Sequence, residues 1–372
     1  MMIYFDNAAT TMIDEDVLKS FLGAQKLAIG NASSTHQLGY AALEFEKKAK
    51  KQIASFFNCN EEDVIFTSGA TESNNLAIKG VVERYKNRGK HIITSKIEHL
   101  SVLNSIKELE EKGFIVTYID VDKNGVIDLN QLIDAMRDDT ILVSIMTVNN
   151  ETGAIQPIEE IARIIKKYPN AHFHTDATQS IGKINIDYSN VDLITFSGHK
   201  INSFKGMGAL IKRNGTDLVH QISGGGHQNG YRSGTTNVPG EIALAKSLRI
   251  AFESQHDNYI KVRKLYDHMI HRLNLIQGID VHCKNGSPFI ISFEVPKKAS
   301  VVAEALSNRE IYVSTKSACS SKKQSSSYVL EAMGLTSWAC SNSIRVSFCK
   351  NNTIEEVNIF CDTLIEILNS IK

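Results

Sequence analysis

A lysine and an aspartate each follow a short apolar run, and together they have the side chains that one cofactor chemistry requires. Lys200 ends the tripeptide that follows the run 191–197, and Asp176 closes the earlier run 171–175. The pair suits pyridoxal phosphate: the amine forms a Schiff base with the aldehyde, and the carboxylate keeps the pyridine nitrogen protonated so that the ring withdraws electrons. Lysines after strands are common on protein surfaces, so the surrounding motifs must decide.

A turn rich in small residues at 67–73 joins the run 64–66 to a segment of helical period. Backbone N–H groups and hydroxyls at such a helix start close around an anion, which predicts phosphate binding. Ser197 and His199, beside the lysine, supply further donors. A simple strand-to-helix turn with a Ser/Thr cap explains the same stretch, so both interpretations stay open.

Three further polar residues follow predicted strands. Gln179 lies shortly after Asp176 and could hydrogen-bond the ring hydroxyl, and His99 lies in a short loop where its imidazole could stack on the ring. Asn150 ends another strand and could contact ring or substrate. A loop histidine is more often solvated or packed, and Asn-Glu-Thr-Gly at 150–153 is also a common turn sequence.

Cys319 lies in the segment 314–327, which contains seven serines and three lysines and is typical of a flexible loop. Nearby positive charge lowers the pKa of a thiol, so a reactive thiol is the favoured interpretation. Arg345 lies on a predicted strand, and a guanidinium fork suits an amino acid carboxylate. On its own, Arg345 is better explained as a surface ion pair on an edge strand.

Between residues 60 and 211 short apolar runs alternate with helical segments, which predicts an α/β fold with a mainly parallel sheet and helices on both faces. Ligands in such sheets bind at the carboxyl ends of the strands. The predicted strands are 64–67, 91–94, 114–119, 141–147, 171–175, 191–196 and 207–211, and the predicted helices are 73–88, 100–111, 129–136 and 158–168.

Past residue 240 a long helical pattern runs to about 274 as a connector, and a smaller α+β unit follows. Its predicted strands are 289–293, 344–348 and 311–313, and its predicted helices are 300–308, 326–333 and 353–371. We expect a large cofactor-binding domain at 15–255, and a small domain formed by 1–14 and 256–372 that carries the Cys319 loop.

The bulk composition excludes several classes of function. Among 372 residues, Lys+Arg and Asp+Glu are 41 each, so nucleic acid and anionic membrane are not expected as main ligands. No secretory signal and no bilayer-spanning apolar stretch is evident. The six cysteines show no zinc spacing, so we expect no metal site, reduced thiols and a cytoplasmic location.

The motifs taken together resemble the cysteine desulfurases of the NifS/IscS group, within the class V aminotransferase-like, fold-type I pyridoxal phosphate enzymes. The resemblance covers nearly the whole chain in ordered motifs. It implies a seven-stranded, mainly parallel sheet sandwiched by helices, with a smaller α+β domain. The motifs that carry it lie at 4–11, 30–36, 66–73, 148–151, 176–180, 197–200, 232–235, 317–319 and 343–345.

The resemblance assigns the cofactor contacts by position. Lys200 would be the Schiff-base lysine, Asp176 the partner of the pyridinium nitrogen, Gln179 the contact of the ring hydroxyl, and His99 a catalytic residue stacked on the ring. The phosphate would be held by Ala70, Thr71, Ser197 and His199, joined by Thr235 from the other subunit of a homodimer.

It also implies the reaction. Asn150 and Arg345 would bind the carboxylate of L-cysteine, and the Cys319 thiolate would attack the substrate sulfur, leaving a persulfide and alanine. The sulfur would pass to an acceptor protein, either an iron–sulfur scaffold or a tRNA-thiolation enzyme. The resemblance also allows Cys319 to act as a transient iron–sulfur ligand.

The chain departs from the family pattern at two loops. The run 201–206 lacks the usual Tyr and Pro after the lysine, and Lys316 replaces a glycine before Cys319. The chain also stops at Lys372, without the extension on which some members dock an iron–sulfur scaffold. These departures remove no catalytic group but leave the sulfur acceptor open.

Three functions remain in competition at this point. A selenocysteine lyase or another class V aminotransferase-like enzyme is the first alternative to a cysteine desulfurase. A true aminotransferase has no use for Cys319, which argues against it. A cofactor-binding scaffold or regulator without turnover is the second alternative, and the combination of Lys200, Asp176, His99 and Cys319 argues against that one.

Overall fold

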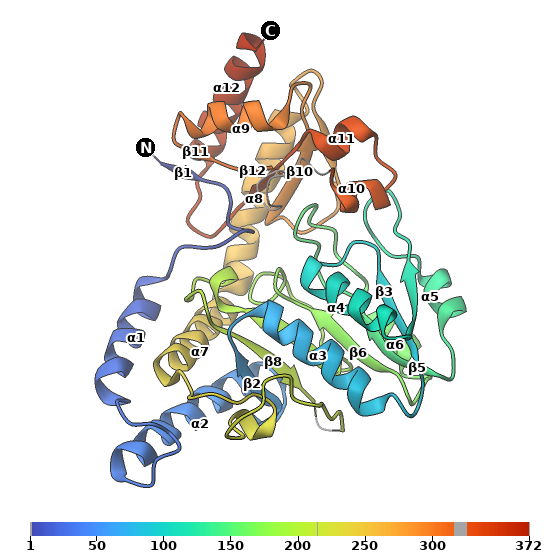
Figure 1. Ribbon diagram of the computed structural model, residues 1–372. Coiled ribbons are helices and arrows are strands. Elements are labelled where there is room, and N and C mark those ends of the chain that lie inside the picture. Colours follow the sequence, from blue (N-terminus) through green and yellow to red (C-terminus); the bar gives the residue numbers. More distant parts are fainter. Residues whose placement is uncertain (1, 214, 316–325, 372) are drawn as a thin grey trace.

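The computed structural model describes residues 2–213, 215–315 and 326–371, and its centre is a seven-stranded sheet (Figure 1). The strands, in sheet order, are β2 (Val64–Thr67), β8 (Gly208–Lys212), β7 (Leu193–Ser197), β6 (His172–Asp176), β5 (Thr140–Ser144), β3 (His91–Ser95) and β4 (Ile115–Ile119). Strands β7 to β4 are parallel, and β8 runs antiparallel to both of its neighbours. The predicted mainly parallel sheet is confirmed.

Helices cover both faces of this sheet because its strands bury alternate residues on opposite sides. Ile65, Ile92 and Leu210 pack in one core with helices α3 (Ala70–Tyr85) and α4 (Leu100–Glu111). Their strand neighbours, such as Phe66 and Ile93, pack in a second core on the opposite face. The helices on that face are α2 (Gln37–Phe57), α5 (Leu129–Ala135), α6 (Ile158–Ile165) and α7 (Val238–Glu253).

A smaller unit with its own core lies above the sheet in Figure 1. Its antiparallel sheet has the order β12 (Ser314–Thr315), β13 (Ser343–Ser347), β10 (Ile290–Glu294) and β9 (Asp280–His282). Helices α8 (Gln255–Leu273), α9 (Ala299–Ser307) and α12 (Ile354–Ser370) pack in the same core. Two short helices, α10 (Tyr328–Ala332) and α11 (Ser337–Ser341), complete the unit.

The N-terminal segment belongs to the small unit before the chain enters the large one. Strand β1 (Ile3–Tyr4) pairs in parallel with β11 (Ile311–Tyr312), and Phe5 packs in the small unit's core. Helix α1 (Glu15–Leu27) then packs against α7. The predicted domain boundaries at 14/15 and 255/256 stay a prediction.

The helical pattern predicted from 240 to about 274 is present, but it is interrupted once. The chain forms two helices, α7 and α8, which meet at Ser254 with a non-helical φ of −104° and ψ of 7°. The Ser254 hydroxyl donates a hydrogen bond of 2.7 Å to the Ile250 carbonyl. A serine that bonds back to its own helix in this way favours a bend, so the chain changes direction between the two units.

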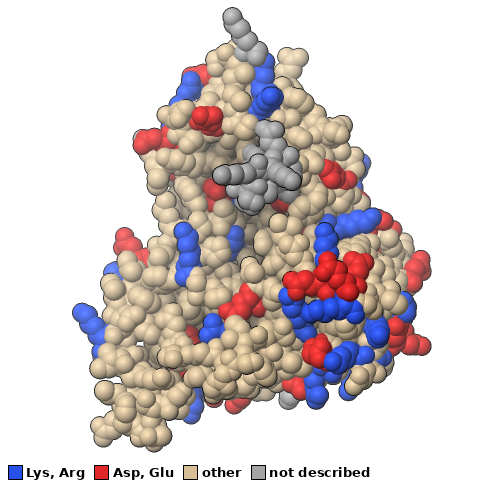
Figure 2. All heavy atoms as spheres, viewed as in Figure 1, with Lys and Arg blue, Asp and Glu red and all other residues tan. Residues whose placement is uncertain are grey.

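Acidic and basic side chains are interspersed on the face shown in Figure 2. This mixture agrees with a formal net charge of zero. None of the helices in the described part of the chain has both the length and the apolar character needed to cross a membrane.

Candidate active site

The predicted site residues meet at the carboxyl edge of the seven-stranded sheet. Strands β2 and β7 both run antiparallel to β8, so β2 points the same way as the parallel strands and ends at the same edge. A cavity of about 510 Å³ opens there, and among the predicted site residues that the structure describes, all except Thr235 line it. Its volume is that of a typical cofactor site.

Lys200 ends a single 3-10 turn, Gly198–Lys200, directly after β7. The turn packs tightly, because a Cβ on Gly198 would lie 3.0 Å from Leu244 and 3.1 Å from Ser203. The Lys200 amine donates hydrogen bonds to the carbonyls of Ala8 and Ala9, the second at 2.7 Å. The N-terminal segment therefore forms one wall of the site around the amine.

Asp176 is the last residue of β6, and two donors hold its buried carboxylate. Asn74 on α3 donates from Nδ2 to Oδ2 at 2.8 Å, and the Thr178 backbone donates to Oδ1 at 3.0 Å. The same Asn74 amide donates to the Ser101 hydroxyl at 2.8 Å, and Ser101 lies 2.8 Å from Nδ1 of His99. One hydrogen-bonded chain thus connects Asp176 to His99.

This chain determines which nitrogen of His99 carries the proton. The Ser101 hydroxyl accepts from Asn74, so its own hydrogen is free for Nδ1 of His99, which also accepts from the Ser101 backbone N–H at 3.2 Å. Burial lowers the pKa of His99, and the negative charge of Asp176 opposes this shift only in part. His99 is therefore a neutral imidazole with its proton on Nε2.

We expect Asn74→Ala to weaken cofactor binding and turnover about tenfold each, because the buried Asp176 carboxylate loses a donor. Retention of pyridoxal phosphate during dialysis and the rate with L-cysteine measure the two effects. The matched control is Asn75→Ala on the next residue of α3, whose side chain caps the Thr71 carbonyl at the surface. Equal behaviour of the two variants would contradict the role of Asn74.

The predicted phosphate end lies where β2 meets α3. Gly69 precedes the helix with φ of +151°, a backbone conformation that favours glycine, and a Cβ added there would lie 3.5 Å from Oγ of Ser197. The first residues of α3, Ala70 and Thr71, line the cavity. Burial, followed by the charge of Lys200, lowers the pKa of His199 to about 4, so this side chain is neutral.

The predicted substrate end contains Arg345 on β13 of the small unit. Its Nη1 donates to the Asn150 carbonyl and its Nη2 to the Asp6 carboxylate, each at 2.8 Å. Nε of Arg345 is buried and has no partner among the described residues. The guanidinium is therefore oriented by Asp6 and the Asn150 carbonyl, and Nε is a buried donor whose partner is not among the described residues.

Glu98, next to His99, is fully buried between Ser95 and the Met146 backbone, and burial raises its pKa to about 8. The folded protein keeps a proton that the unfolded chain releases at its usual pKa of 4.5. The unfolding free energy of the wild type therefore falls as the pH rises from about 4.5 to about 8. We expect the unfolding free energy of Glu98→Gln to increase by about 2 kcal/mol relative to that of the wild type as the pH rises from about 5 to about 9.

Urea unfolding of both proteins across this pH range tests the prediction for Glu98. The difference in unfolding free energy should grow steadily with pH, because only the wild type has a side chain to deprotonate at this position. Parallel pH profiles would show that Glu98 titrates in the folded protein as it does in the unfolded chain.

Two predicted site residues are not assigned to the cavity. Cys319 lies outside the described residues. Thr235 is exposed and does not line the cavity; its assignment to a neighbouring subunit stays a prediction. The nearby Arg232 connects its loop to the start of α3 through an ion pair with Glu72 at 2.8 Å.

Sequence reasoning missed several contacts at this site. Asn74 holds Asp176, Asp6 holds Arg345, and the carbonyls of Ala8 and Ala9 accept from Lys200. Asp6, Ala8 and Ala9 lie in a motif that carries the family resemblance, which is the one signal that could have indicated them.

The model of one protein family, aminotransferase class-V, matches residues 3–360. The chain belongs to this family. Class V aminotransferases are pyridoxal phosphate enzymes, and the residues here fit that cofactor: an amine, a carboxylate held by two donors, and a helix start whose glycine leaves space toward Ser197.

Relatives of this class V chain resemble it over most of their length. It is 42% identical over 367 residues to cysteine desulfurase IscS of Colwellia psychrerythraea, covering 96% of this chain and 90% of the relative. A solved NifS-like protein superposes with a TM-score of 0.92 at 38% identity, with both chains fully (100%) covered. SspA in complex with cysteine gives a TM-score of 0.81 at 32% identity, covering 94% of this chain and 100% of the other.

Proposed function

We propose that this class V enzyme is a pyridoxal phosphate-dependent cysteine desulfurase that converts L-cysteine to L-alanine and transfers the sulfur to its own Cys319. The single observation that carries the proposal is the cavity in which Lys200, Asp176, His99 and Arg345 converge. The named activity of the IscS relative supports the choice of reaction.

The residues that line the cavity have different roles in the proposed reaction. Arg345 and Asn150 bind the substrate carboxylate, and Arg345 is already oriented for this by Asp6. The Lys200 amine removes the Cα proton of the substrate. Bound pyridoxal phosphate supplies an electron sink. Asp176 holds the ring nitrogen in its protonated form, and neutral His99 offers its flat ring for stacking.

Cys319 is the proposed sulfur acceptor. Its thiolate attacks the substrate sulfur, so that the carbon–sulfur bond breaks, alanine forms and the enzyme keeps a persulfide. Two equivalents of an external thiol then release sulfide, regenerate the cysteine and form one disulfide. Among the described cysteines, burial raises the pKa of Cys59 to about 11 and of Cys283 and Cys361 to about 12, so these thiols are poor nucleophiles at neutral pH.

We further propose a homodimer that delivers sulfur to an acceptor protein, either an iron–sulfur scaffold or a tRNA-thiolation enzyme. Large apolar side chains are exposed near the N-terminal helices, among them Leu22 at 53% and Leu27 at 64%. That corner of the molecule, at the lower left of Figure 2, displays few charged side chains, as a covered surface would. The cytoplasmic location stays a prediction from the sequence.

The purified enzyme loaded with pyridoxal phosphate tests the proposal when it is mixed with L-cysteine and a thiol reductant. We expect the visible band of the cofactor to change and alanine and sulfide to form in equal amounts. Selenocysteine and other amino acids serve as competing substrates. A loaded enzyme that forms no alanine from cysteine would overturn the proposed reaction.

A further inference from the structure

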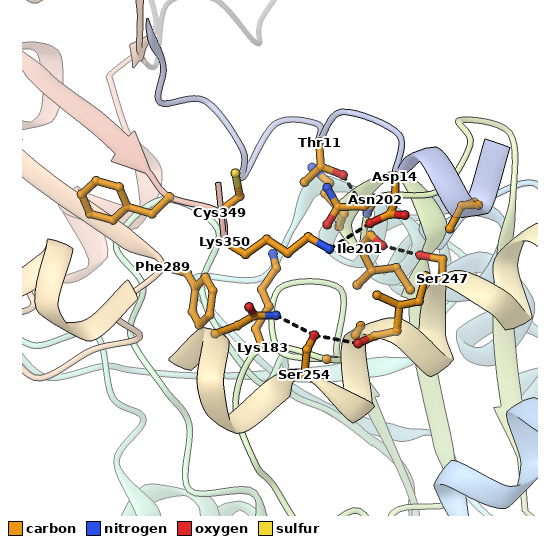
Figure 3. A pocket seen from close by; sticks show the side chains of 17 residues that line it. Thr11, Asp14, Lys183, Ile201, Asn202, Ser247, Ser254, Phe289, Cys349 and Lys350 are labelled. Carbon is orange, nitrogen blue, oxygen red and sulfur yellow. Dashed lines mark hydrogen bonds and ion pairs between the residues drawn. The ribbon is translucent and has the colours of Figure 1, made fainter. Parts of the chain in front are cut away.

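Lys183 lies behind the cofactor cavity and has no part in the reaction described above. It lines a second cavity together with Lys200, and Figure 3 shows it among the residues there. This second cavity measures about 50 Å³, which holds a water molecule but no organic ligand. The role of the Lys183 amine must therefore lie in its contacts with the protein.

The fold places Lys183 beside Gln179 by a tight turn after β6. Gly182 has φ of +68°, and a Cβ added there would lie 2.5 Å from Cβ of Ala251 on α7. Glycine at this position lets the backbone press against α7. Lys183 and Gln179 are four residues apart, and the Lys183 amine donates to Oε1 of Gln179 at 3.1 Å.

This contact and a second one fix the orientation of the Gln179 amide. The Ala8 carbonyl can only accept, so the Gln179 amide nitrogen must face Ala8 and the amide oxygen faces the Lys183 amine. The amide nitrogen then faces the opposite side, where it donates to the Ala8 carbonyl at 2.9 Å. An amide nitrogen has two N–H donors, so one remains for the cofactor cavity, which Gln179 also lines.

Burial of the Lys183 amine costs folding free energy, because the amine is removed from water. That cost supports a functional role for Lys183. Burial, followed by the positive charge of Lys200, lowers the pKa of Lys183 to about 7. A nonpolar side chain would fill the same space without removing an amine from water. Perturbed groups of this kind gather at functional sites.

We propose that Lys183 is a positioning residue that holds the Gln179 amide by its oxygen and so presents an N–H donor to the ring oxygen of the cofactor. The inference rests on the proposed cofactor site and deepens it. Lys183 also polarises the amide, which strengthens the N–H as a donor.

The pH dependence of the cofactor's visible band tests this role independently of turnover. A donor to the ring oxygen reduces the negative charge that retains the neighbouring proton, so its loss should raise the pH midpoint of the band. We expect Lys183→Met to raise the midpoint by about one pH unit, the size of one hydrogen bond. Lys350→Met is the matched control, since Lys350 lines the same small cavity but pairs with Asp14; its midpoint should equal that of wild type.

The Gln179→Ala background separates positioning from a direct effect of charge. If Lys183 acts through Gln179, adding Lys183→Met to Gln179→Ala should produce no further shift. An equal additional shift would show a through-space charge effect and overturn the proposal, as would an unchanged midpoint in Lys183→Met alone.

Lys183→Gln, which removes the charge but keeps an N–H donor, provides a second route if Lys183→Met fails to fold. Positioning predicts a smaller shift for this variant, and a shift of a full pH unit would overturn it. A wild-type band that titrates normally without alanine formation from cysteine would refute the desulfurase reaction while leaving the role of Lys183 to be decided by the midpoints.

Discussion

Replacement of Lys200 by alanine is expected to abolish turnover of L-cysteine, with a loss of at least about 10³-fold. Lys200 is the one predicted Schiff-base lysine, and its amine points to the wall formed by Ala8 and Ala9. No other side chain is proposed to remove the Cα proton. The rates of alanine and sulfide formation by the loaded variant measure the loss.

Covalent attachment of the cofactor gives a second measurement on the same variant. Borohydride reduction of the loaded wild type should leave the cofactor bound in the intact mass spectrum, and the Lys200→Ala spectrum should show no adduct. Lys205→Ala is the control, because Lys205 also lines the cavity and should leave the adduct in place. A persistent adduct in Lys200→Ala would assign the attachment to another lysine.

Replacement of Cys319 by alanine is expected to lower the rate of sulfide release by at least about 10²-fold. The visible absorbance of the cofactor should stay the same as in the wild type. The cofactor band is preserved because Lys200 and Asp176 are untouched. Incubation with L-cysteine in the absence of reductant should add one sulfur atom to the mass of the wild type and none to Cys319→Ala.

Cys59→Ala is the matched control for the thiol, because burial raises the pKa of Cys59 to about 11 and keeps it protonated. It should retain both the persulfide and sulfide release. Turnover that survives Cys319→Ala undiminished would refute the persulfide mechanism and would favour the selenocysteine lyase or aminotransferase alternatives.

The strands of the central sheet were predictable because they are buried on both faces and read as continuous apolar runs. Strand β2 begins and ends at the predicted residues, and β3, β4 and β8 differ only at their ends. Helices α1 and α2 were missed for a physical reason. Helix α1 buries only Val17 and Ala24, and α2 turns small residues and a Glu46–Lys50 ion pair inward, so neither displays a broad apolar stripe.

The convergence of the candidate site was predictable where a side chain follows closely on a strand. Lys200, Asp176 and His99 lie at the same sheet edge for this reason. Contacts from elsewhere in the chain were not predictable. Asn74 lies inside a helix, and the sequence does not distinguish a polar residue that faces the site from one that faces solvent. Backbone carbonyls such as that of Ala8 have no sequence signature.

The N-terminal segment described above has a practical consequence for work with this enzyme. Between Tyr4 and Thr11 the chain leaves the small unit's core and passes the candidate site. In this segment Asp6 pairs with Arg345, and the Ala9 carbonyl accepts from the Lys200 amine. The Thr11 backbone N–H donates to the His199 carbonyl at 2.8 Å. Proteolytic trimming or a bulky affinity tag at this end would therefore disturb both the small unit's core and the site around Lys200. Purification handles belong after α12, whose C-terminal end lies at the top of the small unit, away from the seven-stranded sheet, in Figure 1.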